Sequence, residues 1–342
     1  MKECWVTEPL HFEMRETEIP EPKDNEVQIK MMAAGVCGSD IHIYKGENPN
    51  SRYPLIPGHE FVGELVQIRG EGSEAFQLGD TVVAQELLTC GRCDACAKGE
   101  GNVCEHLKII GVHADGGFAE FVRVKTRKMY RVPKLVDLRR AALIEPLAVA
   151  VHDVRMSGLK IGESALVIGG GPIGQLIGCV AKAAGARKVV ISEVVESRRA
   201  LAEKLGMIAL NPLDPDFSAK LLAANDGNNY DVSFEAAGVP SAITTCVDYT
   251  KNTGTIVQIA MTREPYPVDT GKLFAKELRV QGVRIHNQYA FEGAVNLVAS
   301  GMLDEAIDLL TSKVFPFDEV AAAFQYAEKN KDAFKVLVQI GD

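Results

Sequence analysis

The stretch ESALVIGGGPIGQLIGCVAKAAGA, residues 163–186, joins an apolar run to a glycine-rich turn and then to an alanine-rich segment that ends at Gly185. The apolar run predicts a buried strand, and the segment after the turn is typical of a helix closed by a glycine. The same order returns at once, with a strand-like run at 187–194 and a helix-like run at 196–206. Further apolar runs lie at 231–238, 254–261 and 278–284. This alternation predicts an α/β domain with a doubly wound parallel sheet.

The turn itself, GGGPIG at 169–174, matches the G-x-G-x-x-G pattern of dinucleotide-binding folds. Gly169 allows a sharp turn, Gly171 lets the backbone approach a pyrophosphate, and Gly174 lets the helix pack closely on the strand. The helix that opens at Pro172 and Ile173 would offer its unpaired N–H groups to the phosphates. Because the pattern follows an apolar strand and opens a helix, it predicts a dinucleotide site.

An acidic residue, Glu193, follows the last glycine by nineteen positions, at the end of the next strand. A carboxylate there accepts hydrogen bonds from the ribose hydroxyls of the adenosine and repels a 2′-phosphate, so we expect NAD as the cofactor. NADP stays as the alternative, because Arg198 and Arg199 lie nearby and a basic group favours that phosphate.

The rest of the chain has a different character. The N-terminal half contains short β-like runs broken by Gly and Pro, which predict a twisted barrel-like or sandwich domain. After residue 288 we expect two amphipathic helices, 290–301 and 318–330, and a strand at 334–340.

Four cysteines are spaced C-x2-C-x2-C-x7-C, namely Cys90, Cys93, Cys96 and Cys104. Four thiolates so close together predict a closed tetrahedral zinc site with a structural role. An iron–sulfur cluster is the alternative, but the ferredoxin run continues with x3-C-P.

A second metal site is predicted from residues that lie far apart. Cys37 in GVCGSDIH, His59 and Glu60 in PLIPGHEFVGE, and Glu145 in LIEPLAVAVHDV supply a thiolate, an imidazole and carboxylates. Three protein ligands leave one position for water or substrate, which is the arrangement of a catalytic zinc.

These motifs, in this order, resemble those of zinc-dependent medium-chain alcohol dehydrogenases, in particular the polyol (sorbitol) and L-threonine dehydrogenase branch. The resemblance covers the whole chain. It implies a GroES-like catalytic domain at 1–148 with a structural zinc lobe at 88–106, a Rossmann NAD-binding domain at 149–285, and a segment at 286–342 that returns to the catalytic domain. It also implies two zinc ions per chain, with Cys37, His59 and either Glu60 or Glu145 at the catalytic ion. The sequence leaves that choice open.

The resemblance further assigns the groups that move protons. Zinc lowers the pKa of a bound hydroxyl, so an alcohol loses its proton before hydride leaves its carbon. Ser39 would receive this proton and His42 would pass it to water. Asp40 would orient His59 through the second ring nitrogen.

The sequence also offers candidate contacts for the substrate. Tyr44, His113 and Arg284 are candidate contacts, and the GVHADGG loop at 111–117 resembles that of dehydrogenases acting on hexonates such as gulonate or galactonate. We therefore expect a secondary alcohol of a polyol or sugar acid. L-threonine and a vicinal diol such as butanediol are the alternatives.

Composition limits the other classes of function. The formal net charge is −9, and no cluster of Lys and Arg predicts contact with nucleic acid. No apolar run reaches the roughly 18 residues of a membrane helix, and the first twenty residues lack a signal-peptide core. We expect a cytoplasmic enzyme and, from the family, a homo-oligomer, either tetramer or dimer. A nucleotide-binding sensor, a zinc ribbon and a zinc-free quinone reductase are disfavoured by the retained metal ligands and the balanced local charge.

Overall fold

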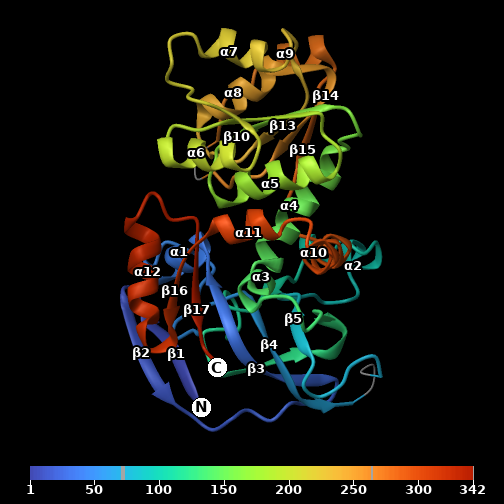
Figure 1. The fold of residues 1–342 in the computed structure, drawn as a ribbon. Helices are drawn as coiled ribbons and strands as arrows, with labels where there is room; N and C mark the ends of the chain where they lie inside the picture. Colours follow the sequence, from blue (N-terminus) through green and yellow to red (C-terminus); the bar gives the residue numbers. More distant parts are fainter. Residues whose placement is uncertain (71–73, 263–264, 342) are drawn as a thin grey trace. The chain divides into compact units, whose positions relative to one another are not determined.

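The computed structural model describes residues 1–70, 74–262 and 265–341 (Figure 1). The chain divides into two compact units. Unit 1 comprises Met1–Glu145 and Asn287–Asp342, and unit 2 comprises Pro146–His286.

Unit 1 is built on a seven-stranded sheet with the order β16-β17-β3-β4-β5-β9, in which β8 also pairs with β3. These strands are β3 (Glu26–Val36), β4 (Glu60–Arg69), β5 (Thr81–Ala84), β8 (Phe121–Lys125), β9 (Met129–Arg131), β16 (Thr311–Pro316) and β17 (Lys335–Gln339). Strand β17 lies antiparallel to β3, so the end of the chain completes a sheet that its beginning starts (Figure 1). Apolar side chains from both segments form one core.

The remaining elements of unit 1 surround this sheet. They are β1 (Lys2–Glu8), β2 (His11–Glu16), β6 (Leu87–Leu88), β7 (Lys108–Ile109), α1 (Gly38–Tyr44), α2 (Asp94–Ala97), α3 (Leu138–Ala142), α10 (Gln288–Ser300), α11 (Asp304–Leu310) and α12 (Val320–Lys329). Short 3-10 turns lie at Gly101–Val103, Thr126–Lys128 and Phe317–Glu319. The two helices expected after residue 288 correspond to α10 and α12, whereas α11 between them was not predicted.

Unit 2 contains a six-stranded parallel sheet with the order β12-β11-β10-β13-β14-β15, which confirms the predicted doubly wound fold. The strands are β10 (Ser164–Ile168), β11 (Lys188–Ser192), β12 (Ile208–Leu210), β13 (Tyr230–Glu235), β14 (Thr250–Gln258) and β15 (Arg279–Gly282). Its helices are α5 (Pro172–Ala183), α6 (Glu196–Lys204), α7 (Phe217–Ala224), α8 (Pro240–Tyr249) and α9 (Thr270–Lys276), and α4 (Ile144–Ser157) begins at the junction of the units. Figure 1 shows α5 and α8 on opposite faces of this sheet.

The strand order reverses beside β10. Strand β11 follows β10 on one side, and β13 adjoins β10 on the other. In open α/β sheets a ligand binds outside the carboxyl ends of the strands at such a switch point. The carboxyl edge of this sheet therefore positions the predicted dinucleotide site.

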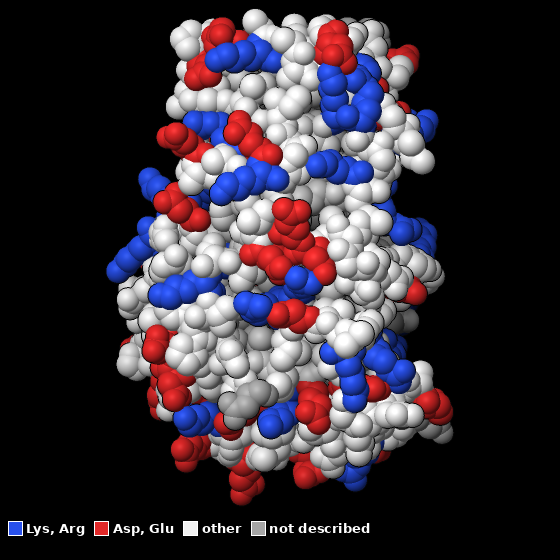
Figure 2. Space-filling model, in the orientation of Figure 1, with Lys and Arg blue, Asp and Glu red and all other residues white. Residues whose placement is uncertain are grey.

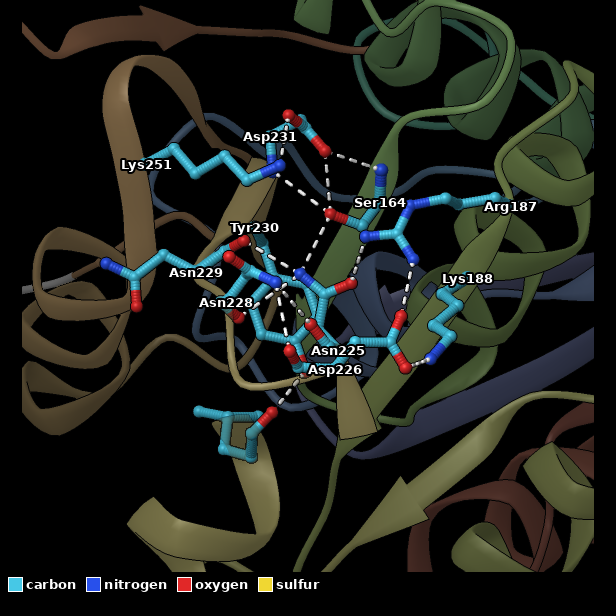
Figure 3. Close-up of polar contacts among 11 residues, drawn as sticks. Ser164, Arg187, Lys188, Asn225, Asp226, Asn228, Asn229, Tyr230, Asp231 and Lys251 are labelled. Carbon is cyan, nitrogen blue, oxygen red and sulfur yellow. Dashed lines mark hydrogen bonds and ion pairs between the residues drawn. The ribbon is translucent and has the colours of Figure 1, made fainter. Parts of the chain in front are cut away.

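A polar cluster, of which Ser164 and Asn225 are buried, lies at the opposite, amino edge of the same sheet (Figure 3). This amino-edge cluster comprises Ser164, Arg187, Asn225, Asp226, Asp231 and Lys251. The amide of Asn225 donates to Ser164 Oγ at 3.2 Å and to two main-chain carbonyl oxygens, and accepts from Arg187 at 2.7 Å. Asp231 accepts from the main-chain N–H of Ser164 and from Lys251. Every polar group of the buried Asn225 side chain is thus satisfied, which fixes where these strands begin.

On the face shown in Figure 2, basic and acidic side chains are interspersed. Among the described residues, no helix has the length and apolar character required to cross a bilayer.

Candidate metal centres and nucleotide site

The first candidate metal centre lies where β3 and β4 of unit 1 meet. Cys37 follows β3 and precedes α1, while His59 and Glu60 stand at the start of β4. The antiparallel register pairs Gly35 with Glu60, and this pairing brings the two segments together. The Cys37 thiol, the His59 ring and the Glu60 carboxylate each offer an atom within 4.8 Å of the other two. The sheet register therefore assembles a sulfur, a nitrogen and an oxygen donor.

Asp40 lies fully buried beside this group. Its Oδ2 accepts from the main-chain N–H of Cys37 at 2.9 Å, and its Oδ1 accepts from that of Gly58 at 3.2 Å. The same Oδ1 lies 3.4 Å from Nδ1 of His59. Asp40 thus contacts both segments that carry the predicted ligands, and it faces the ring nitrogen that the resemblance assigns to it.

Glu60 has a partner that the sequence analysis missed. Lys335, the first residue of β17, places its Nζ 2.5 Å from Glu60 Oε1, and both side chains are buried. The second oxygen, Oε2, is buried and has no hydrogen-bond partner. A buried carboxylate oxygen left beside a thiol and an imidazole fits a metal ligand, because such an oxygen is costly to leave without a partner. The one sequence signal for Lys335 was a charged residue opening an otherwise apolar strand.

The electrostatics of this group favour positive charge. Burial lowers the pKa of His59, but the Asp40 carboxylate and Cys37 outweigh it and hold that pKa well above its ordinary value. Burial raises the pKa of Glu60, and Glu145 adds to this effect while Lys335 opposes it. Burial also lowers the pKa of Lys335, yet Glu60 and Cys37 reverse the effect and raise it. A divalent cation supplies the charge that these ligands favour.

The structure distinguishes Glu60 from Glu145, the two candidate carboxylate ligands that the sequence left open. Glu60 belongs to the group of donors within 4.8 Å that contains Cys37 and His59, and Glu145 does not. Glu145 is buried at the start of α4, and its charge raises the pKa of Glu60. The geometry thus favours Glu60 as the carboxylate ligand.

The predicted proton-relay residues lie on α1. Ser39 Oγ is 3.5 Å from Nε2 of His59. The half-exposed His42 places its Nδ1 2.7 Å from Oε2 of Glu47, a partner that was not predicted. Hydrogen bonds from His42 and Lys45 lower the pKa of Glu47 to about 2.

Of the candidate substrate residues, Tyr44 and His113 belong to unit 1 and Arg284 belongs to unit 2. Tyr44 stacks on Phe12 with ring centroids 4.5 Å apart, and its hydroxyl donates to the carbonyl oxygen of Leu10. His113 accepts from the main-chain N–H of Ile109 at 3.1 Å. Arg284 is exposed just after β15 in unit 2. Their contact with a substrate stays a prediction.

The loop at 111–117 has a role that its resemblance to hexonate dehydrogenases did not suggest. Gly116 donates its N–H to the carbonyl oxygen of Ile56, and Gly117 donates to that of Gly58, both at 2.8 Å. The loop therefore supports, by main-chain hydrogen bonds, the segment that carries His59.

The four-cysteine lobe forms the second candidate metal centre. All four sulfurs lie within 4.8 Å of one another, and all four cysteines are free thiols. The Sγ atoms of Cys90 and Cys96, and those of Cys93 and Cys104, are each 3.9 Å apart. A tetrahedral site with Zn–S bonds of about 2.3 Å requires sulfur–sulfur distances of about 3.8 Å.

Hydrogen bonds from the N–H groups of Cys96 and Glu105 lower the pKa of Cys93 to about 6, which favours the thiolate. The lobe fits a structural zinc.

The nucleotide turn has the geometry that its glycines predict. Gly169 has φ +104°, and a Cβ there would lie 2.8 Å from the carbonyl carbon of Ala236. A Cβ on Gly174 would collide with the carbonyl oxygen of Gly169. Helix α5 begins at Pro172 with Gly171 as its N-cap. The turn is therefore too tightly packed for any side chain at 169 or 174.

Glu193 lies beside this turn and is buried. Its Oε2 accepts from the N–H of Gly170 and its Oε1 from that of Val195, both at 2.8 Å. Arg198 NH1 lies 3.8 Å from Glu193 Oε2. Gln175, which was not predicted, donates to the carbonyl oxygens of Gly170 and Arg198 and so ties the turn to α6.

Together, the parallel sheet with its glycine turn and the β-rich unit with two metal centres define a zinc-type alcohol dehydrogenase. Family models agree: residues 23–134 match the alcohol dehydrogenase GroES-like domain, and residues 172–300 match the zinc-binding dehydrogenase family. The chain belongs to the zinc-dependent medium-chain alcohol dehydrogenases, which confirms the class of protein that its motifs resemble.

Similar proteins cover nearly the whole chain. It is 39% identical to 2-dehydro-3-deoxy-L-galactonate 5-dehydrogenase of Pseudoalteromonas atlantica, over 93% of this chain and 92% of that one. It is 36% identical to L-threonine 3-dehydrogenase of Pyrococcus furiosus, with the same coverage of both chains. Among solved structures, an alcohol dehydrogenase (rspB) of E. coli in complex with NADH superimposes with a TM-score of 0.93 at 31% identity, covering 99% of each chain.

Cys93→Ser tests the structural centre. We expect the variant to lose about one zinc per chain and to show a lower thermal midpoint, because the lobe has little apolar core of its own. Zinc content by atomic absorption and differential scanning calorimetry measure the two effects. Cys246→Ser, a buried thiol outside the lobe, should keep the full zinc content. An unchanged midpoint with normal zinc content in Cys93→Ser would remove Cys93 from the centre.

Proposed function

We propose that this protein oxidises a secondary alcohol of a sugar acid or polyol with NAD, using a zinc ion held by Cys37, His59 and Glu60. The observation that carries the proposal is the convergence of these three donors within 4.8 Å in a chain that also contains a dinucleotide-binding turn. Zinc bound there would act as a Lewis acid that makes the substrate hydroxyl acidic enough to lose its proton.

The protein's own residues would prepare this site. Asp40 lies 3.4 Å from Nδ1 of His59 and would orient the ring through that nitrogen, which leaves Nε2 for the metal. Lys335 holds one oxygen of Glu60, which leaves the other for the same ion. Glu145 would adjust the charge of Glu60 without ligating the ion. The ligands are thus oriented before any metal arrives, which is what a tightly bound catalytic ion requires.

The substrate proton would leave through α1. Ser39 lies beside His59 and would accept the proton, and His42 would release it to water because its side chain is half exposed. The Glu47 carboxylate fixes the orientation of the His42 ring through Nδ1. The opposite ring nitrogen, Nε2, is therefore the one that would exchange the proton.

The proposed substrate class rests on the relatives. The name of the Pseudoalteromonas atlantica protein specifies oxidation at carbon 5 of a six-carbon sugar acid. L-threonine is the second candidate, favoured by the Pyrococcus furiosus relative. His113, Tyr44 and Arg284 remain proposed substrate contacts.

Cys37→Ser tests the catalytic centre. We expect turnover to fall by at least a thousandfold, because the hydroxyl is a poor zinc ligand, while the affinity for NADH changes less than threefold. Reduction of NAD at 340 nm is measured with gulonate, galactonate, sorbitol, butanediol and L-threonine. Zinc-stripped protein serves as a negative control, and Cys179→Ser, a buried thiol in unit 2, as the matched variant. Equal loss of NADH binding and turnover in Cys37→Ser would contradict its role as a metal ligand.

Glu193→Ala tests the choice of cofactor. The carboxylate would bind the adenosine ribose of NAD and repel the additional phosphate of NADP. We expect the KM for NAD to rise about tenfold and that for NADP to fall or stay constant, as Arg198 then faces the phosphate alone. Initial rates with each cofactor measure the ratio. A ratio equal to that of the unmodified protein would place Glu193 outside the ribose site.

We also propose that the chain forms a homodimer through β15. This strand is the edge of the six-stranded sheet, and all its residues are exposed or half-buried. Val280 on β15 is 49% exposed and Phe274 on the preceding helix is 86% exposed. A second copy pairing its own β15 across a two-fold axis would satisfy the free N–H and C=O groups and cover these apolar side chains.

Val280→Lys tests this interface. We expect sedimentation velocity to show a dimer, or a tetramer built from dimers, for the unmodified protein and smaller species for the variant. The cause is the buried charge that the substitution would create. Leu213→Lys, a substitution at another exposed apolar residue of unit 2, serves as the control. A monomeric unmodified protein, or a Val280→Lys variant of unchanged size, would contradict the proposal.

A further inference from the structure

A buried carboxylate and a half-buried amide stand next to each other at the carboxyl edge of the unit 2 sheet. Glu235 is the last residue of β13 and Gln258 the last residue of β14. The parallel register pairs the two residues directly. Glu235 has no exposed surface. This edge is also the one from which the glycine turn and Glu193 project, since those residues follow β10 and β11 in the same sheet.

The Glu235 carboxylate accepts three hydrogen bonds from amide groups. Oε1 accepts from the main-chain N–H groups of Ala237 at 3.0 Å and Gly238 at 2.8 Å. Oε2 accepts from Nε2 of Gln258 at 2.6 Å. A neutral acceptor would serve the two main-chain groups equally well. The carboxylate accepts on both of its oxygens, which a side-chain amide with its single oxygen cannot do.

Glu235 and Gln258 together connect two loops, through the carboxylate and the main-chain oxygen of Glu235 and through the amide of Gln258. The loop after β13, residues 236–238, folds back onto Glu235 Oε1. The loop after β14 is held because the main-chain oxygen of Glu235 accepts from the N–H groups of Ile259 and Ala260. Gln258 Nε2 also donates to the carbonyl oxygen of Ala260 at 3.0 Å. The two loops are therefore fixed to each other as well as to their own strands.

The first of these loops also sets the nucleotide turn. Ala236 donates its N–H to the carbonyl oxygen of Ile168, the last residue of β10. The carbonyl carbon of Ala236 lies so close to Gly169 that a Cβ there would be 2.8 Å away. A displacement of this loop would therefore push on the first glycine of the dinucleotide-binding turn.

We propose that the Glu235–Gln258 pair is a positioning device for the dinucleotide, which holds the loops after β13 and β14 and, through Ala236, the glycine turn in the form that receives the cofactor. The inference rests on the dinucleotide-binding role proposed above. Ligands bind outside the carboxyl ends of the strands at a switch point, so these loops border the site. Loops held in their bound form bind more tightly, because no ordering is required on binding.

The amino-edge cluster provides the comparison, because it is a polar network around a fully buried side chain, Asn225, in the same sheet (Figure 3). It lies at the edge remote from the glycine turn. A substitution there should lower stability without reaching the cofactor. Asn225→Ala is therefore the matched control for a substitution at Glu235.

The test measures the dissociation constant of NADH by fluorescence titration of the zinc-loaded full chain, together with the thermal midpoint. In Glu235→Gln an amide donor would face the donor of Gln258, and we expect the dissociation constant to rise at least tenfold. Gln258→Glu would place two carboxylates together and should weaken binding similarly. The double variant, Glu235→Gln with Gln258→Glu, again opposes a donor to an acceptor between the two side chains but loses the bond to Ala260, so it should bind NADH more tightly than either single variant and less tightly than the unmodified protein. Asn225→Ala should lower the midpoint and keep the dissociation constant.

Two results would overturn the inference. One is a Glu235→Gln variant that loses thermal stability as Asn225→Ala does but keeps its affinity for NADH. The other is a double variant that binds as weakly as the single ones. Binding does not depend on turnover, so an unmodified protein that binds NADH but oxidises no alcohol would refute the proposed function and leave this inference standing.

Discussion

The buried ion pair between Lys335 and Glu60 connects the C-terminal segment of unit 1 to the candidate catalytic metal centre. Two charges can be buried together only with close geometry, and removal of one partner from such a pair typically costs about 3–5 kcal/mol. Strand β17 brings Lys335 there by pairing with β3 next to Cys37, since Val336 is the register partner of Val36. The C-terminal segment is therefore part of the metal centre as well as of the sheet.

The two units use strand ends in similar ways. In unit 1 the end of β3 and the beginning of β4 meet and bring Cys37 to His59 and Glu60. In unit 2 the ends of β10 and β11 place the glycine turn beside Glu193. Hydrogen-bonded strands form a rigid support, so side chains and turns at their ends are held with little freedom. In both sites the pairing of the strands fixes the positions of the side chains and turns that follow them.

The features that the sequence predicted are those formed by residues close together in the chain. The glycine turn, the four-cysteine lobe and the alternation of strands and helices each depend on spacing within a short segment, and spacing is visible in the letters. Partners distant in the chain were missed: Lys335 for Glu60, Arg198 for Gln175, and Gln258 for Glu235. Their side chains are polar residues in apolar strands or helices, and only the folded register shows which group each one meets. Glu60 and Glu145 could not be ranked for the same reason, because the difference between them is a distance in space.

The two metal centres differ in how much chain each requires. The four thiols of the lobe lie within fifteen residues, whereas the catalytic group needs residues 37 and 59–60 and a lysine 275 residues beyond Glu60. Closing a short loop costs little entropy, and a thiolate cluster binds zinc while it folds. During synthesis the lobe can therefore take up its ion while the C-terminal third is still unmade. The candidate catalytic ligands gain the contact with Lys335 only when the last strand docks, so a chain truncated before β17 would keep the lobe and lose this support.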